Sequence, residues 1–400
     1  MPIPKMSDFD LKGKRILIRE DFNVPLKNGE ITSDLRIRAA LPTIKQALKA
    51  GAKVMLMSHL GRPNEGTYDE AFSLAPVARH LSNLLKMEVP LIQHWVDGFN
   101  MGDATVVLFE NVRFHHGETD NNVELSKKMA GLCDIFVMDA FATSHRAESS
   151  TCGIIKYAKQ ACLGPLMLSE LEALNKILEK PAHPVVAIVG GSKVSTKLAL
   201  LDSLVKKVDA LIIGGGIANT FLAAEGYTVG KSLHEPDLID EAERLTLEAK
   251  KRNAEIPVPV DVVVAERFME NTENYVRLVS QIDDNEKIFD IGPDTIKAFI
   301  AVIKKAKTIL WNGPVGAFEI EEFSHGTQAI AKAVAESKAF KVAGGGDTLA
   351  AIEKYRISNK IDYISTGGGA FLTVLEGKKL PVILALEERA MKNEKNEKVA

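Results

Sequence analysis

Short runs of apolar, mostly β-branched residues alternate along the chain with longer segments in which apolar residues recur every three or four positions. The short runs predict strands, and the longer segments predict amphipathic helices. In the first part of the chain the predicted strands cover residues 15–18, 53–57, 105–108 and 135–138, and the predicted helices cover 34–50, 70–85 and 124–131. In the second part the predicted strands cover residues 185–189, 210–213, 261–265, 287–291, 308–310, 341–342 and 363–364. This alternation predicts parallel sheets with helices on both faces, an α/β fold.

The chain has 400 residues, more than a single hydrophobic core usually accommodates, so two domains are expected. The boundary is predicted near the turn at Gly164-Pro165, which precedes an amphipathic helix over residues 168–179 and a proline-flanked linker. The lysine- and glutamate-rich end, residues 391–400, is expected to fray. The predicted domains are residues 1–168, an inter-domain helix and linker over 169–184, residues 185–379, and a C-terminal segment over 380–400.

Charge and cysteine content exclude some classes of protein. Lys and Arg number 50 and Asp and Glu 53, a net charge of −3, which argues against a general nucleic-acid binder. The three cysteines have neither zinc-site nor disulfide spacing, so a reduced, cytoplasmic location is expected. The apolar runs are too short to span a bilayer, and the N-terminal segment has no apolar leader core, so no membrane partner is expected.

Five glycine clusters in the second half each follow a predicted strand. Glycine at the carboxyl end of a parallel strand lets the backbone approach a phosphate, and the next helix offers free N–H groups. A single cluster is better explained by a tight strand-to-helix turn, but five on one sheet edge favour nucleotide binding. The P-loop and G-x-G-x-x-G patterns are absent. The clusters are Gly190-Gly191, Gly214 to Gly216, Gly313 with Gly316, Gly344 to Gly346, and Gly367 to Gly369.

Basic residues follow the predicted strands of the first half in the same way. Arginine binds carboxylates and phosphates in a bidentate manner, so a cluster at one sheet edge suits a small polyanion. Each arginine alone is better explained by a surface salt bridge, but that explanation is poor for all of them together. The residues near these strand ends include Asp21, Asn23, Arg36, His59, Arg62, Arg113 and Arg146.

Together these segments resemble the phosphoglycerate kinase family. The matching motifs include SHLGRP at residues 58–63, DAFATSHR at 139–146, GGSKVSTK at 190–197 and WNGPVGAFE at 311–319. Further matches cover residues 15–26, 110–114, 214–220, 344–348 and 365–369, in the family's order and over nearly the whole chain.

The resemblance implies two doubly wound parallel-sheet (Rossmann-like) lobes separated by a cleft, hinge bending near residues 163–184, and a C-terminal segment that returns to the N-terminal lobe. It implies a monomer that transfers the acyl phosphate of 1,3-bisphosphoglycerate to ADP, giving 3-phosphoglycerate and ATP, with Mg²⁺ as cofactor. The in-line transfer would follow domain closure and need no general base, since both nucleophiles are already anionic.

The resemblance also implies roles for individual residues. Arg36, Lys193 and Lys197 would stabilise the transferring phosphoryl group, and Asp347 would approach the metal. The phosphoglycerate would be held in the N-terminal lobe by Asp21, Asn23, Arg36, His59, Arg62, Arg113 and Arg146. The nucleotide would be held in the C-terminal lobe by Lys197, Gly215, Gly216, Asn312, Pro314, Glu319, Gly345, Gly346, Asp347 and Thr348.

Several positions depart from the family pattern, among them the residues Ala370 to Thr373 and the charged tail after Leu386. Ile288 stands where the family has a glycine beside the adenine, and Glu148 stands where histidine or glutamine is common. Two other functions compete with the kinase. A nicotinamide-dependent dehydrogenase would use similar strand–glycine–helix units but lacks its fingerprint, and a non-catalytic metabolite-binding protein would have no need of Lys193, Lys197 and Asp347.

Overall fold

The computed structural model describes residues 3–365 and 367–397, with side chains described up to residue 392. The chain divides into two compact units, Met1–Glu172 with Lys379–Ala400, and Ala173–Lys378. Each unit contains a parallel sheet of its own, so the predicted α/β class is confirmed.

The first unit is built on a six-stranded parallel sheet in the order β5-β6-β4-β1-β7-β8. The chain lays strands on one side of β1 and then crosses to β7 on its other side. In doubly wound sheets, ligands bind where the winding direction reverses. The strands are β1 (Arg15–Arg19), β4 (Lys53–Met57), β5 (Leu91–Ile92), β6 (Val106–Phe109), β7 (Ile135–Met138) and β8 (Gln160–Leu163).

Helices α1 (Leu35–Lys49) and α2 (Ala75–Leu85) share one buried cluster with alternate residues of β1, β4, β6 and β7. In α1 the apolar residues Ile37 and Ile44 lie on the buried face, as the helical periodicity predicts. The remaining elements of this unit are α3 (Val123–Gly131), α4 (Ile154–Tyr157), the start of α5 (Pro165–Leu178), α13 (Pro381–Glu397), a β2–β3 hairpin (Leu26–Lys27 and Glu30–Ile31), and the short turns η1 (Met6–Asp8), η2 (Glu70–Phe72), η3 (Val112–Phe114), η4 (Phe141–Thr143) and η5 (Ser149–Gly153).

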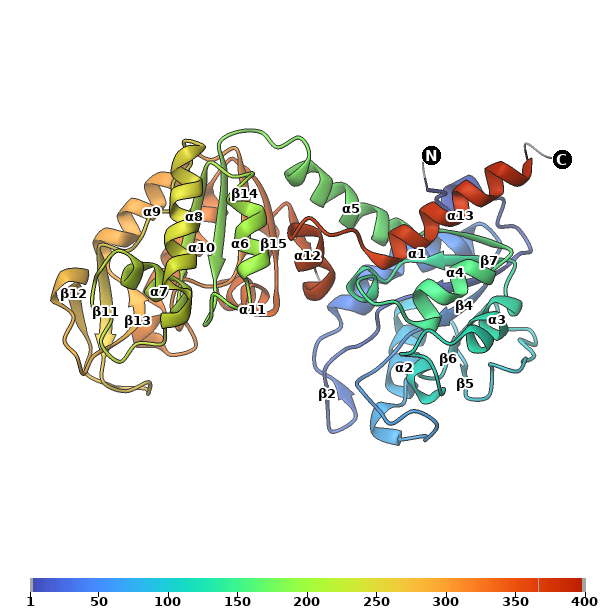
Figure 1. The fold of residues 1–400 in the computed structure, drawn as a ribbon. Helices are drawn as coiled ribbons and strands as arrows, with labels where there is room; N and C mark the ends of the chain where they lie inside the picture. Colours follow the sequence, from blue (N-terminus) through green and yellow to red (C-terminus); the bar gives the residue numbers. More distant parts are fainter. Residues whose placement is uncertain (1–2, 366, 398–400) are drawn as a thin grey trace. The chain divides into compact units, whose positions relative to one another are not determined.

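The C-terminal helix α13 belongs to the first unit, where it packs against α4 and η5 (Figure 1). The Arg389 guanidinium donates hydrogen bonds to the carbonyl oxygens of Ile155, at 2.7 Å, and Lys159, at 2.7 Å. The helix continues to Glu397 through the segment predicted to fray, and residues 398–400 lie outside the described part of the chain.

The second unit is built on a five-stranded parallel sheet in the order β10-β9-β14-β15-β16. Its winding direction reverses between β9 and β14. One face packs on α9, α10 and α11 through a cluster that includes Phe299, Ile330 and Ile352. The strands are β9 (Val185–Gly190), β10 (Ala210–Gly214), β14 (Thr308–Asn312), β15 (Phe340–Gly344) and β16 (Tyr363–Ser365). The helices are α6 (Leu198–Leu204), α7 (Gly216–Ala224), α8 (Ile239–Lys251), α9 (Pro293–Lys305), α10 (His325–Glu336), α11 (Gly346–Lys354) and α12 (Gly368–Leu375), with short turns η6 (Pro236–Leu238), η7 (Val279–Gln281), η8 (Glu321–Phe323) and η9 (Ser358–Lys360).

The prediction that residues 261–265 and 287–291 belong to a parallel sheet is wrong. They form β11 (Asp261–Ala265) and β13 (Lys287–Ile291) of a separate antiparallel sheet, with β12 (Tyr275–Leu278) on its far edge. The segment between β11 and β13 supplies β12 and no crossover helix, and parallel neighbours need such a crossover. Strand β12 was not predicted, because its residues are mostly exposed on both faces and do not alternate between apolar and polar side chains.

Two helix boundaries also differ from the prediction. Helix α5 begins at Pro165, not at residue 168, because proline suits the first position of a helix. The helix predicted over 70–85 is interrupted: η2 ends at Phe72, and α2 starts at Ala75 with Pro76 in its first turn. Among the described residues, no helix combines the length and apolar character needed to cross a membrane.

Candidate functional site

The five glycine clusters of the second unit follow the five strands of its parallel sheet, as predicted. Two of them, after β9 and β14, meet where the winding direction reverses. A Cβ atom added to Gly190 would lie 1.7 Å from the carbonyl oxygen of Pro314, so these two strand ends touch through their backbones. At Gly215 the backbone has φ of +64°, a conformation that favours glycine.

Lys197 anchors the same junction. Its Nζ donates hydrogen bonds to the Gly190 carbonyl oxygen at 2.5 Å and to the carbonyl and Oδ1 oxygens of Asn312 at 3.1 and 2.7 Å. Burial lowers the pKa of the Lys197 ammonium to about 8, and the charge of Asp347 partly opposes that shift. The ammonium is therefore held at the strand ends by carbonyl dipoles, close to a carboxylate at the start of α11.

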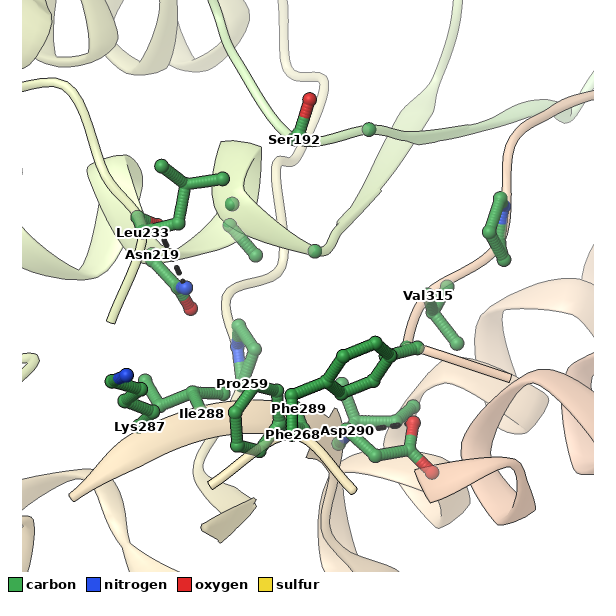
Figure 2. Close-up of a pocket in the computed structure, with 18 of the residues that line it drawn as sticks. Ser192, Asn219, Leu233, Pro259, Phe268, Lys287, Ile288, Phe289, Asp290 and Val315 are labelled. Atoms are coloured by element: carbon green, nitrogen blue, oxygen red, sulfur yellow. Dashed lines mark hydrogen bonds between the residues drawn. The ribbon is translucent and has the colours of Figure 1, made fainter. Parts of the chain in front are cut away.

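A cavity of about 600 Å³ opens beside this junction. Figure 2 shows the rings of Phe268 and Phe289 beside Pro259 and Ile288 on one wall, and Leu233 near Asn219 on another. The Phe268 and Phe289 ring centroids are 5.4 Å apart. The walls are therefore apolar and aromatic, as a planar heterocycle requires. Ile288, the departure from the family pattern, lies in this wall.

The predicted nucleotide-binding residues fall into two groups. Those that line the cavity are Gly215, Gly216, Pro314, Glu319 and Asp347. The others hold the strand ends or lie nearby: the Asn312 side-chain amide donates to the Gly344 carbonyl at 2.7 Å, and the Thr348 hydroxyl accepts from the Gly313 N–H at 2.7 Å. Gly345, before the first turn of α11, has φ of +102°, and the next residue, Gly346, is exposed. Lys193, predicted to stabilise the phosphoryl group, is exposed in the loop before Lys197.

Residue pattern did not predict the aromatic wall. Phe268 lies in an irregular loop and is exposed, so no periodicity marks it. Asp290, at the end of β13, also lines the cavity and accepts hydrogen bonds from the N–H groups of Gly326 and Ile291. Burial raises the pKa of the Asp290 carboxyl to about 7. Only the antiparallel sheet and its loop bring Phe268, Phe289 and Asp290 to the cavity beside the carboxyl ends of the parallel strands.

In the first unit, three of the predicted arginines meet in one pocket of about 390 Å³. The pocket is lined by Arg62, Arg113 and Arg146, together with Pro63, Glu65, Thr119 and Glu148. Arg113 is buried and donates to the Gly61 carbonyl oxygen at 2.7 Å. Three guanidinium groups and two carboxylates around one pocket favour an anionic ligand.

A second group of predicted residues lies at the carboxyl end of β1. The Arg36 guanidinium pairs with the Asp21 carboxylate at 2.9 Å and donates to the Asn23 carbonyl oxygen at 2.9 Å. The Asn23 side-chain oxygen accepts from the Gly61 N–H at 2.9 Å, and the Gly61 carbonyl receives Arg113. This chain of contacts links the end of β1 to the loop after β4 and to the arginine pocket.

The imidazole of His59 lies among these cations. Its burial and the positive charges of the surrounding arginines lower its pKa well below the usual value, so the ring is neutral at pH 7. The Nδ1 atom is 3.4 Å from Nη2 of Arg19, and arginine can only donate. Nδ1 is therefore the acceptor, and the hydrogen is on Nε2. The arginines whose charges act on His59 are Arg19, Arg36, Arg113 and Arg146.

Arg19 and Glu118 are buried members of this site that were not among the predicted site residues. The Arg19 guanidinium donates to the Ser150 hydroxyl at 2.9 Å, and that hydroxyl donates to Glu118 at 2.5 Å. Burial raises the pKa of the Glu118 carboxyl to about 7, against the opposing charge of Arg19. Arg19 is a basic residue at the end of a predicted strand, which is the pattern that marked the other arginines. Glu118 lies in a polar loop that resembles any surface segment.

Comparison with known proteins agrees with this geometry. The phosphoglycerate kinase family model matches residues 6–378. A phosphoglycerate kinase from Nitratidesulfovibrio vulgaris is 58% identical over 392 residues, which cover 98% of this chain and 100% of the relative. The structure of phosphoglycerate kinase from Coxiella burnetii matches with a TM-score of 0.93 at 54% identity, and that from Pyrococcus horikoshii with 0.82 at 33%, each over 97% of this chain and 100% of the other. The resemblance found in the motifs is thereby confirmed, and the chain belongs to the phosphoglycerate kinase family.

Proposed function

We propose that this protein catalyses the reversible transfer of the acyl phosphate of 1,3-bisphosphoglycerate to ADP, giving 3-phosphoglycerate and ATP. The observation that carries the proposal is the arginine cluster of the first unit, where Arg62, Arg113 and Arg146 line one pocket. Such a cluster is costly to assemble, because the charges repel one another, and an anionic ligand offsets that repulsion.

The phosphoglycerate is bound by the first unit. Arg62, Arg113 and Arg146 surround the pocket and hold the phosphate through charge-assisted hydrogen bonds. Nε2 of His59 carries a hydrogen and donates to an anionic oxygen without adding a net charge. Asp21 and Asn23 orient the hydroxyl and carboxylate end, where Arg36 is already paired with Asp21.

The nucleotide is bound by the second unit. The aromatic cavity receives the base, and Glu319 at its edge contacts the ribose. Gly215, Gly216 and Pro314 line the way from this cavity to the strand ends, and the N-termini of α7 and α11 present N–H groups toward phosphates. Lys197 lies at the point where β9 and β14 end and supplies a partly buried cation there.

The residues fit a magnesium–nucleotide complex. Asp347 is exposed and lines the cavity, and the negative charge of its carboxylate raises the pKa of Lys197 against the effect of burial. Mg²⁺ prefers oxygen ligands and is commonly held by one carboxylate together with substrate phosphates, so Asp347 would hold it. When bound, the ion neutralises charge on the phosphates.

The transfer requires alignment and charge neutralisation rather than a general base. The attacking group is a carboxylate in one direction and a diphosphate oxygen in the other, and both are anionic at neutral pH. Arg36, Lys193 and Lys197 stabilise the charge on the transferring phosphoryl group, and exclusion of water strengthens each of these interactions. The substrates are held by separate units, so the units approach each other before the transfer.

The test is a coupled assay of ATP formation from ADP and 1,3-bisphosphoglycerate, with and without Mg²⁺. We expect activity that depends on Mg²⁺, whereas no ATP formation at any metal concentration would contradict the proposal. Titration with NADH, followed by fluorescence, should show no saturable binding, which separates this activity from that of a dehydrogenase. We further propose a cytoplasmic location, since the three cysteines are unpaired and buried, as in proteins kept reduced. We also propose a monomer, as the family resemblance implies.

A further inference from the structure

Glu148 is a buried carboxylate in a pocket that must attract anions. Its side chain is 5% exposed, and its Oε1 accepts a hydrogen bond from Nη2 of Arg113 at 3.0 Å. The same oxygen lies 3.8 Å from Nη1 of Arg146. One oxygen is thus shared between two arginines, and the two-oxygen fork that a simple arginine–carboxylate pair prefers is not formed.

The backbone holds this carboxylate in place. The Glu148 N–H donates to the Thr151 hydroxyl at 3.0 Å, and that hydroxyl donates to the Arg146 carbonyl at 2.9 Å. The Glu148 carbonyl accepts from the N–H groups of Cys152 and Gly153 at the end of η5. These hydrogen bonds fix the backbone of Glu148 relative to that of Arg146. The Glu148 side chain then contacts Arg113, which lies on a different loop.

The two arginines need such a partner. Arg113 follows β6 and is buried, whereas Arg146 follows β7 and is about one third exposed. Two guanidinium groups that line one pocket repel each other. A carboxylate between them offsets the repulsion and limits their separation.

We propose that Glu148 is a positioning residue that holds Arg113 and Arg146 at the spacing needed to bind the phosphate of phosphoglycerate. This inference rests on the proposed function, because it assigns the phosphate of that substrate to this pocket. Glu148 does not itself contact the substrate: its negative charge alone would weaken anion binding, so its value lies in the placement of the two cations.

Three variants of the full-length protein separate placement from charge. Glu148→Asp keeps the negative charge, but its side chain is one methylene group shorter, so the carboxylate lies farther from Arg113 and Arg146. Glu148→Gln keeps the shape of the side chain and removes the charge. The matched control is Glu65→Gln, which removes one charge from the same pocket. The Glu65 carboxylate accepts from the N–H groups of Gly117 and Thr119 and from the Thr119 hydroxyl.

The Kd values for 3-phosphoglycerate and for ADP are measured by calorimetry. We expect both Glu148 variants to raise the Kd for 3-phosphoglycerate roughly tenfold, the usual effect of losing a hydrogen bond between charged groups, with the Kd for ADP unchanged. Glu65→Gln should leave the Kd for 3-phosphoglycerate equal or lower, because the pocket becomes more positive.

The inference is overturned if Glu148→Gln lowers the Kd as Glu65→Gln does, or if Glu148→Asp binds like the parent protein. It is also overturned if both Glu148 variants lose ADP binding, because Glu148 would then serve the fold as a whole. Failure of the unaltered protein to bind 3-phosphoglycerate would instead contradict the proposed function.

Discussion

Burial gives single side chains of this protein protonation states that their residue types alone do not predict. His59 is neutral among arginines, and Lys197 has its pKa lowered to about 8. Glu20, at the end of β1, shows the opposite case: burial and the nearby charges of Asp139 and Asp21 raise its pKa well above the usual value. The shifts at Lys197 and Glu20 each lead to a prediction, and the arginine pocket leads to another.

The first prediction concerns Lys197. Since its pKa is about 8, the ammonium loses its proton as the pH rises through that value, and kcat/KM for the magnesium–ADP complex should fall on the alkaline side. Lys197→Ala should lower kcat by about a hundred- to a thousandfold, as the loss of one preorganised donor usually does. The KM for phosphoglycerate should change little. Steady-state kinetics between pH 6 and 10 check both parts, and a Lys197→Ala enzyme with a normal kcat would contradict them.

The second prediction concerns the arginine pocket. Arg62→Ala should raise the KM for phosphoglycerate by about ten- to a hundredfold, the loss of one hydrogen bond between charged groups, and should leave the KM for ADP unchanged. The matched control is Arg38→Ala on α1, because Arg38 is exposed and paired with Asp34. Equal effects of the two substitutions on the phosphoglycerate KM would show that Arg62 makes no specific contact.

The third prediction concerns Glu20. The pKa of Glu20 is raised in the folded state, so the folded protein keeps a proton that the unfolded chain loses near pH 4.5. The contribution of Glu20 to the free energy of unfolding therefore falls as the pH rises above that value. Glu20→Gln should therefore increase the free energy of unfolding by about 1–3 kcal/mol near pH 8 and by much less near pH 4. Urea unfolding at both pH values is the measurement. Glu30→Gln, at an exposed position, should have no effect, and a Glu20→Gln effect independent of pH would refute this explanation.

At the scale of elements, the nucleotide edge depends on how closely strand ends approach one another. β9 and β14 are neighbours, and their last residues meet at the loop that contains Pro314. A helix begins after β10 at Gly216 and after β15 at Gly346, so the edge presents N–H groups where the backbones are crowded. The parallel sheet thus produces the edge proposed to bind phosphates through backbone packing more than through side chains.

The fourth prediction tests this crowding. Gly190→Ala places a Cβ atom 1.7 Å from a backbone oxygen of Pro314, so the two strand ends must separate. The free energy of unfolding should fall by about 3 kcal/mol, the upper end of the cost of overpacking. Gly346→Ala is the matched control for stability, because nothing lies within 4 Å of its added Cβ atom. Thermal unfolding of the two variants should differ clearly, and similar melting temperatures would contradict the argument.

At the scale of the whole molecule, the chain connects its two units twice. It leaves the first unit within α5, after Glu172, and returns at Lys379 to form α13. Each unit has its own parallel sheet and its own pocket. The two connections are therefore where a change in the relative position of the units would be absorbed.

The fifth prediction is that the two units close when both substrates are bound. In-line transfer requires the acyl phosphate and the nucleotide to be in direct contact, and each is held by a different unit. Small-angle X-ray scattering should show a smaller radius of gyration with 3-phosphoglycerate and magnesium–ATP together than with either alone. Identical profiles in all conditions would exclude closure.

Several parts of the candidate site could be predicted because each depends on a local rule. Glycine clusters after apolar strands marked the carboxyl ends of the second sheet, and basic residues after the strands of the first half marked the pocket lined by Arg62, Arg113 and Arg146. Phe268, Glu118 and the pairing of Glu148 with Arg113 could not be predicted, since each depends on segments far apart in the chain.

The alternation of strands and helices, the parallel sheets and the residue types at their carboxyl ends follow from the amino-acid order alone, because periodicity and glycine placement act over a few neighbouring residues. The antiparallel sheet over residues 261–291, which lines the cavity of the second unit, and the neutral state of His59 among the arginines become visible only in the folded chain. Strand direction and the protonation of a buried group depend on which distant segments pack together and on the charges they bring, and no local pattern records either.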